Sequence, residues 1–338
     1  MARTRRPPAV ARVLERVTAT VRKNEMVAPD DLVVVAVSGG PDSVCLLYSL
    51  WHLRRLLKIR LVAFHFDHRL RPESASEAAY VRRLCARLRM QLHERVAEEE
   101  PGKGESVEAW ATAARTSAAN DLRRELDGAS FAEGHTLDDQ AETVLLNLVR
   151  GTGLEGVVGI LPGDRASRII QPLLDVTRVE VEAFCRALHL QPRRDPMNED
   201  RRYLRAVVRY DVLPMLEEVS GRGVKSAIVR TAENLRSDRD ELYASGLRAY
   251  RRIVDQGDDG AIRFDASELR GLPVSLAARV VRLAVYDALS TDWAAPWSKP
   301  AIEAVLDLAA GRPGRRRDLP DGRVARRDRT GVIVERRV

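Results

Sequence analysis

The stretch that decides the fold runs from Leu32 to Ser43 and reads LVVVAVSGGPDS. Its first half, up to Val37, is a continuous apolar run, as in a strand that is buried on both faces. Its second half consists of turn-forming residues, and helical apolar spacing follows as far as Leu57. We therefore predict a strand, a loop and a helix, with the loop at the carboxyl edge of a parallel sheet, where open α/β sheets bind ligands.

The loop Ser38-Gly39-Gly40-Pro41-Asp42-Ser43 predicts a phosphate site. Two glycines let the backbone approach a pyrophosphate closely, and the amides that open the following helix carry a partial positive charge. A plain strand-to-helix turn is the alternative, because the same residue types also suit a turn. The order of the residues favours phosphate binding. The loop lacks the lysine of a Walker A motif, which disfavours transfer of a γ-phosphate.

Apolar runs and helical patterns alternate along the rest of the first two hundred residues. This rhythm predicts an α/β fold with a doubly wound parallel sheet. The pattern changes beyond residue 220, so we expect a catalytic domain at 1–218 and a second domain at 219–338. Strands are expected at 32–37, 60–66, 91–96, 130–133 and 168–172, and helices at 43–57, 74–88, 107–126, 138–150 and 178–188.

The second domain is predicted to be smaller and mostly helical, with a C-terminal β-hairpin. A long, charge-rich helix from Lys225 to about Asp255 is typical of a connecting helix. Two short strands, 323–327 and 331–335, flank a polar turn. The arginines of this tail either bind RNA phosphates or lie on a solvated surface strand. They are Arg315, Arg316, Arg317, Arg323, Arg326 and Arg327.

Composition limits the class of protein. The net charge is +7 and the pI about 9.6, which suits a polyanionic partner, although composition alone does not establish one. Neither a signal-peptide apolar block nor an uncharged stretch long enough to span a membrane is found, so we expect a cytoplasmic protein. Cys45, Cys85 and Cys185 lie far apart in apolar helical runs, which predicts buried structural thiols.

A second constellation opens the helix expected at 138–150. His135, Asp139 and Glu142 follow one another at i, i+4 and i+7, on one face of that helix. This face should point to the same carboxyl edge as the phosphate loop. It could ligate Mg²⁺, bind an amine or move a proton, or its acids could simply cap the helix. A GxGxxG pattern at 151–156 follows a helix instead of a strand, which disfavours a dinucleotide site.

Taken together, these segments resemble the tRNA(Ile)-lysidine synthetases, a family of PP-loop ATP pyrophosphatases. The resemblance covers most of the chain and is strongest from residue 32 to 215. The matching stretches are 38–43, 65–71, 134–143 with 150–153, 172–174, 195–198 and 319–322.

The resemblance implies a fold like that of the adenine nucleotide alpha hydrolases and a two-step reaction. ATP, with Mg²⁺, would adenylate the C2 carbonyl oxygen of the wobble cytidine in a tRNA(Ile) with a CAU anticodon, releasing pyrophosphate. The ε-amine of free lysine would then displace AMP to give lysidine. Adenylation is needed because an amide-like oxygen leaves poorly, whereas AMP leaves well.

The resemblance also implies catalytic roles for five residues. Asp42 would help to hold Mg²⁺ and position the pyrophosphate, and Asp139 would be the second metal ligand. His135 and Asp139 would lie at the reacting centre. Arg115 would contact ATP or the reacting phosphate, and Glu142 would help to hold the lysine amine.

Nucleotide contacts are implied for the loop 38–43 and for His65, and Arg205 would contact the nucleotide or the RNA. The chain departs from the usual family pattern at several positions. The family usually has Arg-Tyr three residues beyond Arg115, Arg-Pro-Leu-Leu at 171–174 and Arg-Asn at 205–206. This chain instead has Ser117 and Ala118, Gln171, and Ala206.

Two rivals remain. A tRNA thiolase would use the same adenylation with sulfur as the nucleophile, but such enzymes commonly carry a cysteine pair, and no CxxC occurs in the chain. A non-catalytic RNA-binding module would act through the basic tail alone. The oligomeric state stays open, with a homodimer as one alternative.

Overall fold

The computed structural model describes residues 6–69, 74–97, 101–102, 107–163, 166–193, 200–221, 223–257, 260–289 and 297–337. The chain forms two compact units, Met1–Glu233 and Asn234–Val338. The division falls within helix α10 (Val224–Ile253), whereas the domain limit at 218 and 219 stays a prediction. No helix in the described part of the chain has the length and apolar character needed to cross a membrane.

The first unit alternates strands and helices in the predicted order. Its strands are β1 (Leu32–Ala36), β2 (Arg60–Asp67), β3 (Leu92–Val96), β4 (Ser130–Ala132) and β5 (Ile169–Ile170). Its helices are α1 (Pro8–Lys23), α2 (Pro41–Leu57), α3 (Ser74–Leu88), α4 (Val107–Glu125), α5 (Leu137–Val149), α6 (Leu154–Val157), α7 (Arg178–Ala187), α8 (Leu204–Val207) and α9 (Leu213–Ser220), with a π-helical segment, η2 (Val208–Val212), between the last two.

The sheet of this unit is parallel, with the strand order β3-β2-β1-β4-β5. Val33 of β1 pairs with Leu61 of β2 on one side and with Ser130 of β4 on the other. The connections run outward in opposite directions from β1 and β4, so the strand order reverses between these two strands. This confirms the predicted doubly wound fold and identifies the β1/β4 edge as the place where such sheets bind ligands.

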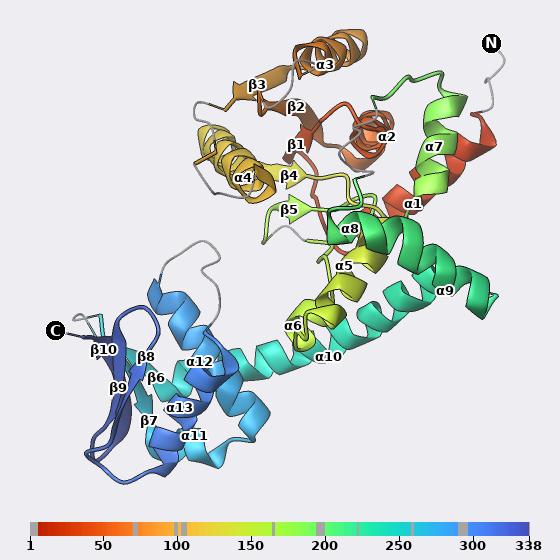
Figure 1. The fold of residues 1–338 in the computed structure, drawn as a ribbon. Helices are drawn as coiled ribbons and strands as arrows, with labels where there is room; N and C mark the ends of the chain where they lie inside the picture. Colours follow the sequence, from red (N-terminus) through yellow and green to blue (C-terminus); the bar gives the residue numbers. More distant parts are fainter. Residues whose placement is uncertain are drawn as a thin grey trace. The chain divides into compact units, whose positions relative to one another are not determined.

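Both faces of the sheet are buried, as the continuous apolar run in β1 predicts. Val33 and Val35 pack with buried residues of α1, α2, α3 and α7, whereas Val34 packs with α4 residues such as Leu122. Successive side chains of a strand point to opposite faces, so one strand serves both layers. Figure 1 shows α4 on one side of the strands and α1, α2 and α7 on the other.

The second unit packs three helices on an antiparallel sheet. The strand order is β6-β7-β10-β9-β8, and the core includes Phe264, Val281 and Val305. The predicted hairpin is confirmed as β9 and β10, while the other three strands were not predicted. The elements are β6 (Val254–Gln256), β7 (Ile262–Asp265), α11 (Ala266–Gly271), α12 (Val274–Leu289), α13 (Lys299–Ala310), β8 (Arg316–Leu319), β9 (Arg323–Arg327) and β10 (Gly331–Arg336).

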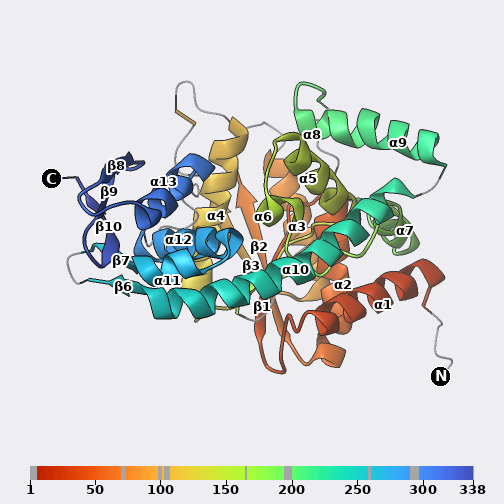
Figure 2. The ribbon, with the colours of Figure 1, turned by 90° about the horizontal axis from the view of Figure 1, so that it is seen from below.

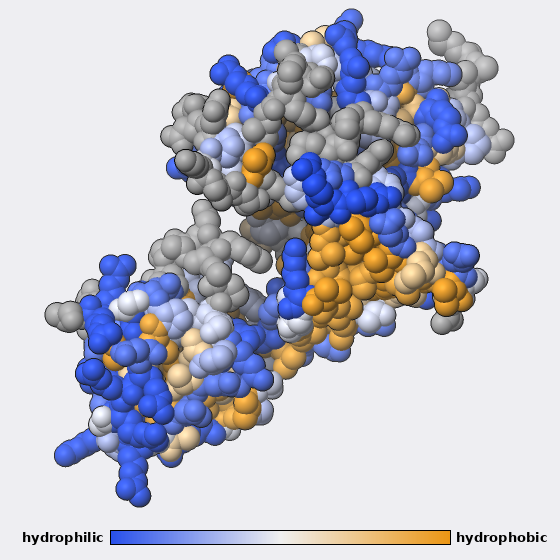
Figure 3. Space-filling model, in the orientation of Figure 1, coloured by the Kyte–Doolittle hydropathy of each residue, from blue (hydrophilic) through white to orange (hydrophobic). Residues whose placement is uncertain are grey.

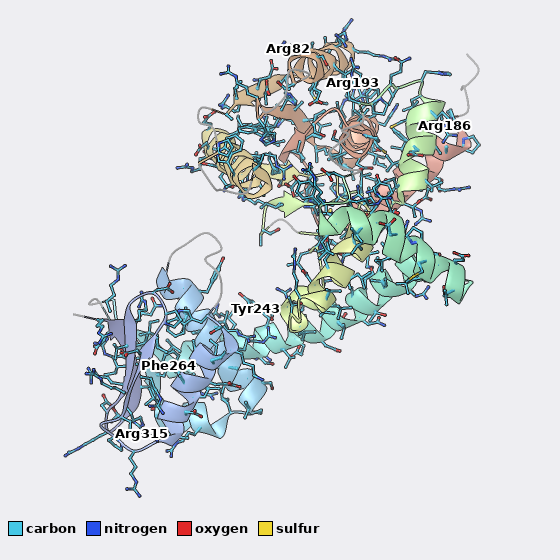
Figure 4. All side chains as sticks on the ribbon, viewed as in Figure 1. Arg82, Arg186, Arg193, Tyr243, Phe264 and Arg315 are labelled. Atoms are coloured by element: carbon cyan, nitrogen blue, oxygen red, sulfur yellow. The ribbon has the colours of Figure 1, made fainter. Side chains whose placement is uncertain are left out.

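The arginine-rich tail divides into exposed and buried members. Arg315 is exposed and points away from the ribbon in Figure 4, and hydrophilic residues dominate the surface over β8 to β10 in Figure 3. Arg323 and Arg327 are only 6% and 8% exposed, on the side of β9 that carries the core residue Ala325. RNA contact by these two arginines was therefore a wrong expectation, because strand alternation turns them inward.

Candidate active site

Two loops meet at the β1/β4 edge. The first joins β1 to α2 and carries the phosphate-loop sequence, and the second joins β4 to α5 and carries His135. Gly134 marks their contact: a Cβ atom built on it would lie 3.2 Å from the carbonyl carbon of Asp42 and 3.3 Å from the amide nitrogen of Ser43. The sequence placed both motifs at one edge, and the structure brings them into contact.

The hydroxyl of Ser43 organises the phosphate loop. The amides of Ser38 and Gly39 each donate to Ser43 Oγ at 3.2 Å, and this hydroxyl donates to the carbonyl of Gly40 at 3.0 Å. Gly39 has φ +92°, a conformation that favours glycine. Its carbonyl accepts from the backbone N–H of Arg193, which Figure 4 labels. The loop is thus held in shape before any anion binds.

Asp42, in the first turn of α2, has an unusual environment. Burial, and then the nearby charge of Asp139, raise its pKa to about 6, while Arg178 and Arg209 act in the opposite direction. Its Oδ1 atom is buried and has no hydrogen-bond partner among the described residues. A buried carboxylate oxygen without a partner is costly, so this atom is suited to bind a cation or a donor that arrives with the substrate.

Asp139 is bound on both oxygens. Its Oδ2 accepts from the amide and hydroxyl of Thr136, at 2.9 and 2.6 Å, in a capping box that starts α5. Its Oδ1 accepts from Arg178, Arg205 and Arg209 at 3.1 to 3.3 Å. Burial by itself would raise the pKa of Asp139, but Arg178, Thr136 and Arg205 outweigh it and lower that pKa to about 2. Asp139 is therefore a carboxylate at any physiological pH.

Glu142 completes a cluster of two carboxylates and three arginines. Its side chain is 1% exposed, and Arg209 binds both of its oxygens, with Nε–Oε1 at 2.6 Å. Arg205 Nε lies 3.1 Å from Oε2, and Arg178 lies 3.5 Å from Oε1. Burial alone would lower the pKa of Arg209, but its hydrogen bonds to Glu142 raise it. The three guanidiniums exceed the two carboxylates by one positive charge.

The cluster is assembled from four segments. Asp139 and Glu142 lie on α5, Arg178 begins α7, and Arg205 and Arg209 lie on α8 and η2, beside α5 in Figures 1 and 2. π-Helical segments often occur at functional sites. Sequence reasoning named Arg205 but missed Arg178 and Arg209. Arg205 and Arg209 are four residues apart, so they lie on one face of a helix. This spacing could have predicted that both arginines contact the same site.

A second ion pair supports the start of α5. Lys225 Nζ, in the first turn of α10, lies 2.7 Å from Asp138 Oδ1, and the amide of Arg178 donates to Asp138 Oδ2 at the same distance. Asp138 is only 5% exposed. Neither contact was foreseen from the sequence, although both fix the helix that carries Asp139 and Glu142.

The remaining predicted residues lie in different settings. His65 is buried, and its Nδ1 lies 2.7 Å from the carbonyl of Val37, so its ring links the ends of β2 and β1. His135 lies on the loop between β4 and α5, with a side chain 36% exposed. Arg115 is exposed on α4 and, within the described residues, takes no part in the arginine–carboxylate cluster. The 195–198 motif lies outside the described residues.

The GxGxxG stretch and the three cysteines were expected to lie outside any dinucleotide, disulfide or metal site. The GxGxxG stretch at 151–156 comes after helix α5, and its second half lies in the short helix α6, so it follows a helix instead of a strand, as predicted. The three cysteines are buried and free. Burial raises the pKa of Cys85 to about 11 and that of Cys185 to about 12, which keeps these thiols protonated.

Replacing Gly134 with Ala should weaken ATP binding about 10-fold, or about 1.4 kcal/mol. The new methyl group would press on the backbone at Asp42 and Ser43, which cannot rotate away. Isothermal titration with ATP measures the effect. Gly153→Ala is the matched control, because φ is −77° there and nothing lies within 4 Å of the added Cβ atom. Equal affinities for the two variants would contradict the assigned contact between the loops.

Comparisons with known proteins identify the family of the chain. The family model of the PP-loop domain matches residues 11–216. A tRNA(Ile)-lysidine synthase of Leifsonia xyli is 37% identical, over 89% of this chain and 89% of its own length. That of Cutibacterium acnes is 36% identical, over 97% and 96%. That of Clostridioides difficile is 32% identical over 80% of this chain. The matched part spans only 59% of the length of that relative.

A solved structure shows the same fold. The U34-tRNA thiolase of Methanococcus maripaludis superposes with a TM-score of 0.57 at 20% identity, over 67% of this chain and 79% of its own. At this identity the likeness concerns the fold alone, which is the doubly wound PP-loop arrangement.

Proposed function

Because the chain belongs to the tRNA(Ile)-lysidine synthase family, a group of PP-loop enzymes that modify tRNA, we propose that it joins free lysine to C2 of the wobble cytidine in a tRNA(Ile) with a CAU anticodon. The reaction passes through an adenylated cytidine. The observation that carries the proposal is the contact at Gly134, which puts a phosphate loop beside a cluster of arginines and carboxylates.

The first step uses the loop 38–43. Its amides and hydroxyls, together with the start of α2, receive the phosphates of ATP, and a loop without a Walker lysine suits cleavage that releases pyrophosphate. Charge builds up on the leaving pyrophosphate, so fixed donors at this edge lower the barrier. The adenylate forms on the cytidine oxygen, and His65 on β2 supports the start of the loop through the carbonyl of Val37.

The residues fit a magnesium ion that is bound mainly through the substrate. Mg²⁺ keeps several waters and usually takes one or two carboxylates together with phosphate oxygens. Asp42 offers an unpartnered buried oxygen for this purpose. Asp139 is a less direct ligand, because Thr136 and three arginines already occupy its oxygens. Bound Mg²⁺ would neutralise charge on the leaving pyrophosphate.

The second step needs a place for lysine. A free amino acid carries a carboxylate and ammonium groups, so it requires both signs of charge within a few ångströms. The arginine–carboxylate cluster presents both. Because Glu142 is saturated by arginines, an ammonium group reaches it by displacing one of them. Arg205, with a side chain 41% exposed, is the most exposed of the three.

The attacking amine must first lose a proton. His135 follows Gly134, where the two loops meet, and its side chain is 36% exposed, so we assign it to the reacting centre. Arg115 keeps its proposed contact with the nucleotide, although it is exposed on α4. The exposed arginines 315–317 of the second unit are proposed to contact tRNA phosphates. A homodimer and a cytoplasmic location are further proposals.

Labelled lysine tests the proposal directly. Full-length protein, ATP, Mg²⁺ and a tRNA(Ile) transcript with a CAU anticodon should incorporate label into the tRNA, while a transcript with a GAU anticodon should not. A thiolase would instead incorporate sulfur when sulfide replaces lysine. The cysteines of this chain are buried and no CxxC occurs in it, so we expect no incorporation of sulfur. Incorporation of sulfur instead of lysine would reassign the chain to the thiolases.

A further inference from the structure

A polar chain of three residues lies at the carboxyl ends of β4 and β5, outside the arginine–carboxylate cluster. Gln171 Nε2 donates to Glu133 Oε2 at 2.8 Å, and the same carboxylate oxygen lies 3.8 Å from His135 Nε2. Gln171 is 4% exposed, and its Oε1 has no hydrogen-bond partner among the described residues. Glu133 and Gln171 have no role in the proposed reaction as described above.

The backbone fixes this arrangement. The amide of Glu133 donates to the carbonyl of Ile170 at 3.0 Å, and the amide of Gln171 donates to Pro162 at 2.9 Å. Adjacent parallel strands therefore bring the Glu133 and Gln171 side chains to one edge. Since His135 follows Glu133 by two residues, its ring is delivered to the same place.

The side chain at position 171 determines whether the negative charge of Glu133 is neutralised by that side chain or remains available to interact with His135. An arginine at position 171 would form an ion pair with Glu133 and neutralise its charge. Glutamine donates one hydrogen bond but carries no charge. It holds the Glu133 carboxylate in place and leaves its negative charge for His135.

Other charged groups on the packed elements do not compete for the ring. Asp138 and Asp139 on α5 are bound by Lys225 and by Thr136 with three arginines. Asp42 on α2 touches this loop through its backbone at Gly134, and the acidic side chain paired with His135 is that of Glu133.

We infer that Glu133, held by Gln171, is a positioning residue that keeps the Nε2 nitrogen of His135 protonated and its Nδ1 nitrogen free to accept a proton from the reacting amine. A carboxylate behind a histidine sets which ring nitrogen carries the proton. The 3.8 Å separation is longer than a hydrogen bond, and such contacts commonly shorten when substrate binds. The role of the free nitrogen rests on the proposed lysine transfer; the orientation of the ring does not.

The ring can be observed without any turnover. The chain has six histidines, so ¹⁵N-histidine labelling of the full-length protein gives few signals, and His135→Gln identifies the one of interest. At mildly alkaline pH the ring of His135 should carry its proton mainly on Nε2. Glu133→Gln and Gln171→Arg should both raise the minor, Nδ1-protonated fraction at least about twofold, the first by removing the charge and the second by pairing it.

Kinetics give the second readout. Glu133→Gln should lower kcat about 10-fold and leave KM for ATP and lysine within about twofold, because a misoriented histidine affects the reacting centre more than binding. Glu15→Gln, an exposed position on α1, is the matched control and should change neither readout. Thermal unfolding checks that the variants are folded.

The outcomes separate the inference from the proposed function. Unchanged ¹⁵N shifts of His135 in folded Glu133→Gln protein would overturn the inference, whatever the activity. If the shifts change as expected but the wild-type protein incorporates no lysine, the positioning role of Glu133 stands and the proposed reaction fails.

Discussion

Replacing Asp42 with Asn should lower the rate of ATP cleavage on the order of 10³-fold and at the same time make the folded protein more stable. The variant keeps the shape of the side chain and removes the carboxylate that is proposed to hold Mg²⁺. Burial raises the pKa of Asp42 from 3.8 to about 6, so the charged form is costly to the fold. By linkage, removing this charge stabilises the neutral-pH protein by on the order of 3 kcal/mol.

The sign of the pH dependence follows from the raised pKa. The stability that protonated Asp42 contributes is present below pH 3.8 and is lost as the pH rises through about 6. The difference in Tm between Asp42→Asn and wild type should therefore be large at neutral pH and vanish near pH 3.8. Asp30→Asn, at an exposed position before β1, should show no such pattern. A Tm below that of wild type at neutral pH would refute this account of Asp42.

Replacing Arg209 with Met should cost the folded protein about 3 to 5 kcal/mol. Arg209 binds both oxygens of Glu142, whose side chain is 1% exposed, and its removal leaves a buried carboxylate with weaker partners. Urea denaturation measures the loss. Arg82→Met is the matched control, because Arg82 also forms a 2.8 Å ion pair, with Glu94, but its side chain is 59% exposed. Because that pair is exposed to solvent, its loss should destabilise the protein far less than the loss of Arg209.

A double variant separates lost charge pairing from lost packing. Adding Glu142→Gln to Arg209→Met removes the uncompensated charge, so the pair should be destabilised less than the sum of the two single variants, by about 1 to 3 kcal/mol. Strict additivity, or a cost for Arg209→Met no greater than that for Arg82→Met, would mean that the cluster contributes little to the fold.

The phosphate loop could be predicted because its signal is local. Buried strand, glycines and helix start are adjacent in the sequence, and the parallel sheet places every strand end at one edge. The capping box of Thr136 and Asp139 is also local, at three residues' separation. For these reasons the doubly wound parallel sheet, the loop and the His135 helix were predicted almost in full, whereas the order of the strands was not predicted.

The arginine–carboxylate cluster could not be predicted in the same way. Arg178 lies 39 residues from Asp139, and Arg209 lies 67 residues from Glu142. The sequence around a single arginine on a helix does not indicate which distant carboxylate it contacts, so Arg178 and Arg209 could not be distinguished from surface arginines. Residues 316–319 were likewise missed as a strand, because three of these four residues are charged and exposed at the edge of the second sheet.

The most direct test of the central claim uses ATP labelled at the α-phosphate and omits lysine. With Mg²⁺ and tRNA(Ile) bearing the CAU anticodon, the label should accumulate on the tRNA as an adenylate, with one pyrophosphate released for each. A chase of unlabelled lysine should then discharge the label as AMP. Formation of ADP and inorganic phosphate, or label that stays on the tRNA when lysine is added, would contradict AMP-forming ligation at the loop 38–43.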